Sequence, residues 1–124
     1  MKSINADLGD FPVPMTRQLA MARQDLNLVE LRVTRACIAK YDAGVVADGT
    51  HEVWLSAIEY AKTYGVNVND AYAQLKSAAE TLPSKRVAFP DGTSARWVEV
   101  AEYPDGVGAI RLQFATELLP YITQ

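Results

Sequence analysis

The chain has 124 residues, of which 49% are hydrophobic and 22% charged, and its net charge is −3. This length suits one domain with a modest core, and no stretch reaches the roughly 18 consecutive apolar residues of a membrane-spanning helix. The single cysteine, Cys37, excludes an internal disulfide and a multi-cysteine metal site, and the first residues lack the apolar run of a secretory signal. We therefore expect a cytoplasmic globular domain.

The negative charge argues against a strongly basic DNA-binding protein, because contacts to phosphate come from Lys and Arg. The charge is unevenly distributed, however. Residues 16–40 contain five cations and two carboxylates, so this segment carries +3 and the rest of the chain carries −6. A local basic surface is therefore compatible with the composition.

The first part of the chain shows no helical stripe and contains Gly9, Pro12 and Pro14. We therefore expect a flexible N-terminal arm over residues 1–15. A short helix is expected to follow, around Thr16–Arg23.

A capping box marks the next helix. Asn27 is followed three residues later by Glu30, and apolar residues then recur at helical spacing. This pattern predicts a helix from Asn27 to about Tyr41 that ends near Gly44. A flexible connection and a short strand over residues 51–55 are expected after it.

A second capping box, Ser56 with Glu59, predicts a further helix, and Gly65 stands where a left-handed residue ends a helix. Asn67 then begins a helix over residues 67–82, which Pro83 ends. Only the turn Gly65-Val66-Asn67 separates the two helices, and two helices joined by a short turn with a glycine are typical of a helix-turn-helix.

Strand patterns follow that second helix. Alternation and turn residues predict strands over residues 86–89, 96–103 and 109–114. A short helical turn is expected over residues 116–119, stopped by Pro120. A hairpin directly after the second helix is the arrangement of a wing. We therefore predict an α+β fold, a winged helix-turn-helix with an additional N-terminal helix and a β-hairpin wing, over residues 16–124.

Several segments carry a family resemblance: Leu28–Arg32, Ala71–Leu82, Trp97, Glu102–Tyr103 and Ile110–Tyr121. The last is the most specific, a strand ending in Phe114, a short helix and then Leu-Pro-Tyr. Together they resemble, in the same order, the N-terminal winged-helix domain of the iteron-binding Rep family of plasmid replication initiators.

The resemblance implies a domain that helps to start plasmid replication at repeated origin sequences, dimerises and contacts the phosphate backbone. The implied partners are double-stranded origin DNA with direct repeats, a second copy of the chain and host replication proteins, with no membrane. Family members continue into a second winged helix that makes the main base contacts. Nothing in this sequence corresponds to it, so we expect a fragment or a shortened relative, and the chain is also less basic than the family.

Candidate DNA-facing residues lie opposite the apolar stripe of the helix over residues 67–82. They are Asn69, Gln74, Lys76 and Ser77. Asn and Gln pair with adenine edges, and Lys meets guanine or phosphate. A plain solvated helix face is the alternative.

Basic residues at the hairpin supply the other candidates. Lys85 and Arg86 form a tight basic pair at the entry to the wing, and Arg96 lies further along it. A phosphate clamp is one interpretation, and protection of an edge strand by charge is the other.

Four aromatic residues fit apolar periods and are expected in the core: Trp54, Tyr72, Trp97 and Phe114. Cys37 is expected to be buried as a small hydrophobic residue. The strand over residues 96–103 has apolar residues on both faces, which predicts helices on one face and a second subunit on the other.

No enzyme, cofactor or metal site is expected, because the sequence has no phosphate-binding glycine loop, nucleophile elbow or HExxH motif. Two other functions stay open. The first is a stand-alone winged-helix transcription regulator, and the second is a protein-interaction winged helix without DNA binding.

Overall fold

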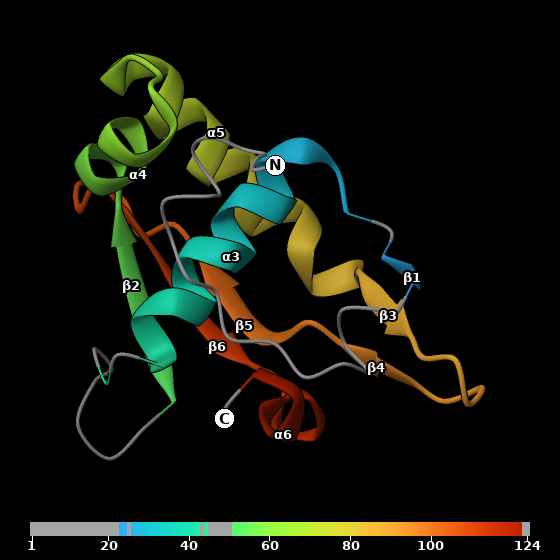
Figure 1. Cartoon of the computed structure of the whole chain (residues 1–124). Coiled ribbons are helices and arrows are strands. Elements are labelled where there is room, and N and C mark those ends of the chain that lie inside the picture. Colours follow the sequence, from blue (N-terminus) through green and yellow to red (C-terminus); the bar gives the residue numbers. More distant parts are fainter. Residues whose placement is uncertain (1–22, 25, 43, 45–50, 123–124) are drawn as a thin grey trace.

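The structure is a computed structural model that describes residues 23–24, 26–42, 44 and 51–122 (Figure 1). In chain order the elements are β1 (Arg23–Gln24), α3 (Leu28–Asp42), β2 (Glu52–Ser56), α4 (Ala57–Tyr64), α5 (Val68–Thr81), the 3-10 helix η1 (Leu82–Ser84), β3 (Arg86–Ala88), β4 (Ser94–Arg96), β5 (Val98–Glu102), β6 (Ala109–Phe114), the 3-10 helix η2 (Thr116–Leu118) and α6 (Leu119–Ile122). No helix within these ranges is long and apolar enough to cross a membrane.

The start of α3 confirms the first predicted capping box. The Asn27 side chain accepts a hydrogen bond from the Glu30 amide, and the Glu30 carboxylate accepts one from the Asn27 amide, both at 2.8 Å. Each bond satisfies an amide that the first helical turn leaves without a partner.

The helix-turn-helix is formed by α4 and α5. The Ser56 and Glu59 side chains form the second predicted capping box, and Gly65 ends α4 in the left-handed region at φ 68°. Asn67 then accepts from the Asp70 amide at 2.8 Å and starts α5. The predicted short turn between the two helices is confirmed.

The strands form two sheets rather than one continuous meander. Their orders are β1-β3-β4 and β2-β6-β5, and all the pairings are antiparallel. The predicted single strand over residues 96–103 is therefore wrong, because the chain leaves one sheet after β4 and enters the other at β5. Trp97 lies at the break, 1% exposed, and its amide donates to the Lys85 carbonyl at 3.3 Å. Burial of this indole fixes the point where the chain changes sheets.

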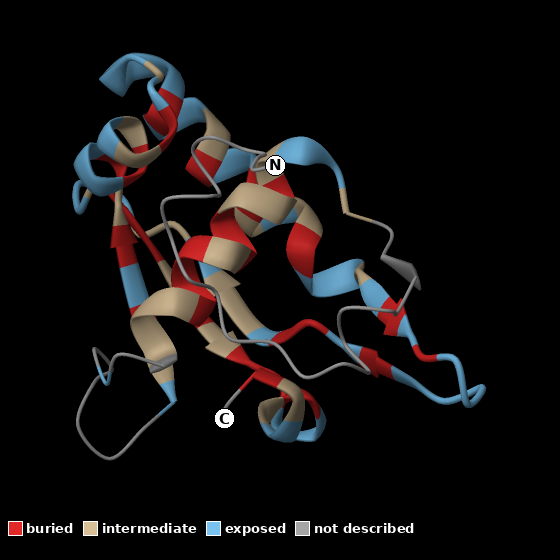
Figure 2. Ribbon diagram, viewed as in Figure 1, coloured by how far each residue is buried: buried red, intermediate tan, exposed pale blue. Residues whose placement is uncertain are grey.

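The core lies between the helices and the inner face of the β2-β6-β5 sheet. In Figure 1, α3 crosses this sheet, and Figure 2 shows buried residues along the facing sides. Val53 pairs with Leu112 and Leu55 with Ile110, and all four are buried. Phe114 continues this face at 1% exposed, and the predicted strand over residues 109–114 is confirmed as β6.

Two of the four aromatic residues expected in the core lie outside it. Trp97 and Phe114 are buried, but Trp54 is 37% and Tyr72 39% exposed. Trp54 lies on the outer face of β2 because Val53 and Leu55 take the inner face and strand side chains alternate. Tyr72 lies at the margin of the α5 stripe, whose buried centre consists of small and aliphatic residues.

The chain ends differ from the expectations in two places. The predicted helix at Thr16–Arg23 lies outside the described residues except for Arg23, which belongs to β1. The predicted arm over residues 1–15 and the connection over residues 45–50 also lie outside the described residues. Pro120 does not stop the last helix but lies inside α6, at its second residue. Proline is tolerated in a first helical turn, where its missing amide would have no partner.

Candidate nucleic-acid interface

The outer face of α5 presents the polar residues that the sequence pattern predicts. Asn69, Lys76 and Ser77 are exposed, while the buried side of the same helix consists of Ala71, Leu75 and Ala78. These exposed side chains are placed to meet a ligand that lies along the helix.

Gln74 has a partner inside the protein. It is half-buried, and its carbonyl oxygen accepts a hydrogen bond from the hydroxyl of the fully buried Tyr60 at 2.7 Å. Burial raises the pKa of Tyr60, although Arg32 opposes that shift, so the phenol keeps its proton and donates. Gln74 thus ties α5 to α4, a role that the sequence alone does not indicate.

Lys85 is directed toward a buried carboxylate. Its Nζ lies 3.5 Å from Oε1 of Glu30, and the Lys85 side chain is 27% exposed while that of Glu30 is 0%. Glu30 also accepts a hydrogen bond from the Thr81 hydroxyl. The sequence marked Glu30 only as a helix cap, because the capping pattern carries no information on which tertiary neighbours bury it.

Arg86 and Arg96 lie directly opposite each other on β3 and β4. Both are exposed, and a guanidinium nitrogen of Arg86 donates to the Ser94 hydroxyl at 3.1 Å. Directly opposed residues in an antiparallel pair have Cβ atoms roughly 4.5–5.5 Å apart, and like charges at that spacing destabilise the pair. An anion between the two guanidiniums would relieve the repulsion.

The sheet order leaves both interpretations of these arginines open. β3 lies between β1 and β4, but β1 pairs only with Val87 and Ala88, so the described partner of Arg86 is on the β4 side. Protection of an edge by charge therefore applies to Arg86 as well as to Arg96 on the outer strand β4, beside the phosphate clamp.

Two carboxylates near the β3–β4 hairpin, Asp91 and Glu99, accept hydrogen bonds from hydroxyl and amide groups. Hydrogen bonds from Thr93 lower the pKa of Asp91 at the hairpin tip. Hydrogen bonds from Thr116 lower the pKa of Glu99, and Arg96 adds a smaller electrostatic contribution. Between Arg86 and Arg96 the hairpin holds two cations and one carboxylate, so it keeps a net charge of +1.

A family model described as "Initiator Replication protein, WH1" matches residues 13–124. The chain belongs to this family. The predicted family is thereby confirmed.

Two solved structures resemble this WH1 domain. The WH1 domain of the MSBI1.176 replication protein, isolated from a multiple sclerosis patient, has a TM-score of 0.62 and 24% identity, covering 79% of this chain and 81% of that one. The Pi initiator protein in complex with iteron DNA has a TM-score of 0.66 and 20% identity, covering 89% of this chain and 49% of that one. At these identities the likeness shows the fold, which confirms the predicted winged helix. No curated protein matches the chain.

The candidate residues of the WH1 domain fall into three groups. Asn69, Lys76 and Ser77 lie on the outer face of α5, and Arg86 and Arg96 lie together on the β3–β4 hairpin. Gln74 and Lys85 are engaged in contacts that join elements of the fold.

A groove of about 410 Å³ runs between α5 and the end of β5. Its lining includes Lys76 but also Glu80 and Glu102. Two carboxylates beside one cation make this groove a poor site for a phosphate. Among the described residues, no group of three or more His, Cys, Asp or Glu side chains is arranged to hold a metal ion.

Proposed function

We propose that this WH1 domain helps to initiate plasmid replication in the cytoplasm by binding double-stranded origin DNA with direct repeats, mainly through the phosphate backbone. Membership of the initiator family supports the role. The Pi initiator, which shares the fold, is described in complex with iteron DNA. The observation that carries the backbone contact is the opposed, exposed pair Arg86 and Arg96.

Two exposed arginines at directly opposed positions would suit a phosphate group by their charge and by the donors that they carry. A guanidinium presents donors in a planar fork that matches phosphate oxygens. If two guanidiniums bound one anion, their attraction to the anion would offset their repulsion of each other. Exposed Asn69, Lys76 and Ser77 on α5 supply additional polar contacts.

The domain is expected to bind DNA weakly on its own. Lys76 lies four residues from Glu80 on the same helix, so the α5 face carries little net charge. Phosphate contacts also carry no sequence information directly. We therefore propose a supporting contact that fixes the position of an initiator on its origin.

The test is fluorescence anisotropy of the chain on duplex DNA taken from beside its own gene, with a scrambled duplex as control, across a series of salt concentrations. We expect weak binding that falls with salt and differs little between the two duplexes. Tight binding to the native duplex alone would favour a stand-alone transcription regulator. Absence of binding at every salt concentration would favour a protein-interaction domain.

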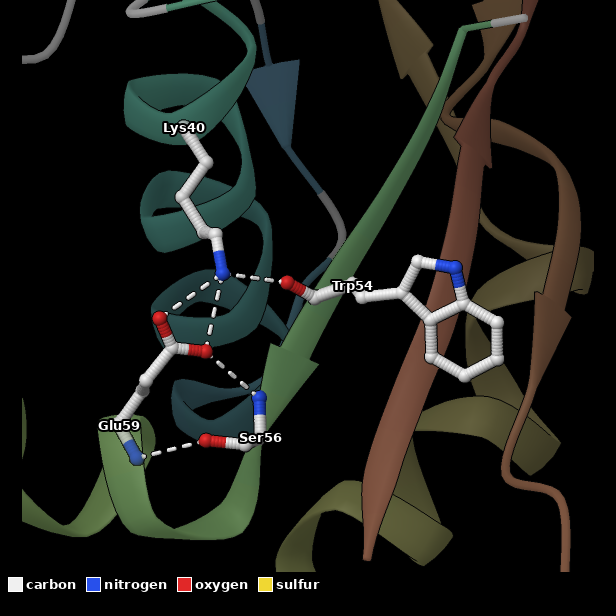
Figure 3. Close-up of polar contacts among 4 residues, drawn as sticks. All are labelled: Lys40, Trp54, Ser56 and Glu59. Atoms are coloured by element: carbon white, nitrogen blue, oxygen red, sulfur yellow. Dashed lines mark hydrogen bonds and ion pairs between the residues drawn. The ribbon is translucent and has the colours of Figure 1, made fainter. Parts of the chain in front are cut away.

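We further propose that the domain forms a homodimer through the outer face of the β2-β6-β5 sheet. Trp54 projects from β2 on the side away from α3 and Lys40 (Figure 3) and is 37% exposed. Its partner across the sheet, Arg111, is paired with both Glu52 and Glu102. A half-exposed tryptophan is the kind of side chain that anchors an interface, and the charges beside it already have partners within the chain.

Analytical ultracentrifugation over a range of concentrations tests the dimer. Trp54→Ser should weaken self-association, while Ile58→Ser, at a 62% exposed position on α4, should leave it unchanged. A mass that stays monomeric at high concentration, or equal weakening by both substitutions, would contradict the proposed interface.

A further inference from the structure

Glu30 is a fully buried carboxylate that belongs to none of the DNA-facing groups. Burying a charge is costly unless partners compensate it. Its Oε1 accepts from the Asn27 amide at 2.8 Å and lies 3.5 Å from Lys85 Nζ, and its Oε2 accepts from the Thr81 hydroxyl. Both oxygens of this side chain are therefore occupied.

These partners come from three separate parts of the fold. Asn27 and Glu30 form the first turn of α3, and Thr81 is the last residue of α5. Lys85 is the residue directly before β3, and its carbonyl accepts from the Trp97 amide just before β5. One carboxylate thus joins the end of α5 to Lys85, directly before β3, and through Lys85 to Trp97, directly after β4.

Along the chain, only the short segment of residues 82–85 connects α5 with the hairpin. We propose that Glu30 is a positioning residue that sets the orientation of the β3–β4 hairpin relative to α5 through Thr81 and Lys85. Lys85 then holds the start of the hairpin against Glu30 and does not contact phosphate. The effect on DNA rests on the proposed function, but the effect on geometry does not.

The geometry is tested by a distance between spin labels on Ala73→Cys in α5 and Ala88→Cys in β3, both at exposed positions. The native Cys37 is buried with its pKa raised to about 12, so it stays unlabelled. Glu30→Gln should shift or broaden the distance distribution. Glu80→Gln, the same change at an exposed position of α5, should not. An unchanged distribution in Glu30→Gln would overturn the proposal.

Thr81→Val serves as a second variant if Glu30→Gln fails to fold. It removes the hydroxyl donor to Glu30 and keeps the shape of the side chain. A smaller shift of the same distance is expected. A variant that only lowers the melting temperature and leaves the distance unchanged would assign Glu30 a purely structural role and overturn the proposal.

Duplex affinity in a double-mutant cycle tests the role of Lys85. Glu30→Gln and Lys85→Met should each weaken binding by about two- to thirtyfold, leave the salt slope unchanged and fail to add in the double variant. A Lys85→Met loss that adds to that of Glu30→Gln and lowers the slope by about one unit would make Lys85 a direct phosphate contact. If the wild type binds no DNA but the label distance responds, the proposed function fails and the positioning role stands.

Discussion

Leu75 and Leu28 occupy opposite environments on neighbouring helices. Leu75 on α5 is 0% exposed, and Leu28 at the start of α3 is 59% exposed. Leu75→Ala should therefore lower the free energy of unfolding by about 2–5 kcal/mol, because it leaves a cavity in the core. Leu28→Ala should change it by no more than about 0.5 kcal/mol.

Urea denaturation of the two leucine variants measures both effects. Equal losses, or a loss below about 0.5 kcal/mol at Leu75, would mean that α5 packs through a different face.

The thiol of Cys37 is shielded in the same core. Desolvation by burial raises its pKa to about 12, while the charge of Lys40 acts to lower the pKa and the charge of Glu59 acts to raise it. Only the thiolate reacts readily with alkylating agents, so labelling at pH 8 should be very slow in the folded protein and rapid in denaturant. Rapid labelling of the folded chain would show that α3 opens or that this side of it faces solvent.

Among the elements, α4 depends on a carboxylate that also contacts α3 and β2. Burial opposes the ionisation of Glu59, but hydrogen bonds from Ser56 and Lys40 outweigh it and lower the pKa from its ordinary value of 4.5. Lys40 Nζ also donates to the Trp54 carbonyl, so one ammonium holds three elements together (Figure 3).

A lowered pKa means that the folded state favours the carboxylate. The stabilisation by Glu59 is therefore present above pH 4.5 and is lost as the pH falls through the folded-state pKa. Glu59→Gln should lower the melting temperature at pH 7, and the difference from wild type should shrink in acid. The same change at the exposed Glu117 is the control. A difference that does not vary with pH would rule out this linkage.

Local sequence signals predicted the helices well because each start is fixed by neighbours along the chain. Asn27, Ser56 and Asn67 each bond to an amide three residues ahead, which the spacing alone reveals. Tertiary neighbours, in contrast, decide that Trp54 and Tyr72 are exposed. They also decide that the chain changes sheets at Trp97. Periodicity shows which side of an element is apolar, but not how much of that side another element covers.

At the scale of the whole molecule, the candidate site was predicted only in part. The sequence identified Arg86 and Arg96 as basic, but their opposition follows from the pairing of β3 with β4. The sequence likewise joined Lys85 to Arg86 as a pair, whereas the fold directs Lys85 toward Glu30. Lys85 and Arg86 are adjacent in the sequence, but contacts with distant segments give them different roles.

The salt dependence of duplex affinity in Arg86→Ala/Arg96→Ala, with Arg86→Lys/Arg96→Lys as the charge-conserving control, shows whether the arginine pair binds the DNA backbone. If the opposed arginines bind phosphate, the alanine variant should weaken binding about equally on native and scrambled duplexes and flatten the salt slope by up to about 2 units. The lysine variant should keep most of the slope. An alanine variant with the slope of the wild type would mean that the arginine pair does not contact the DNA backbone.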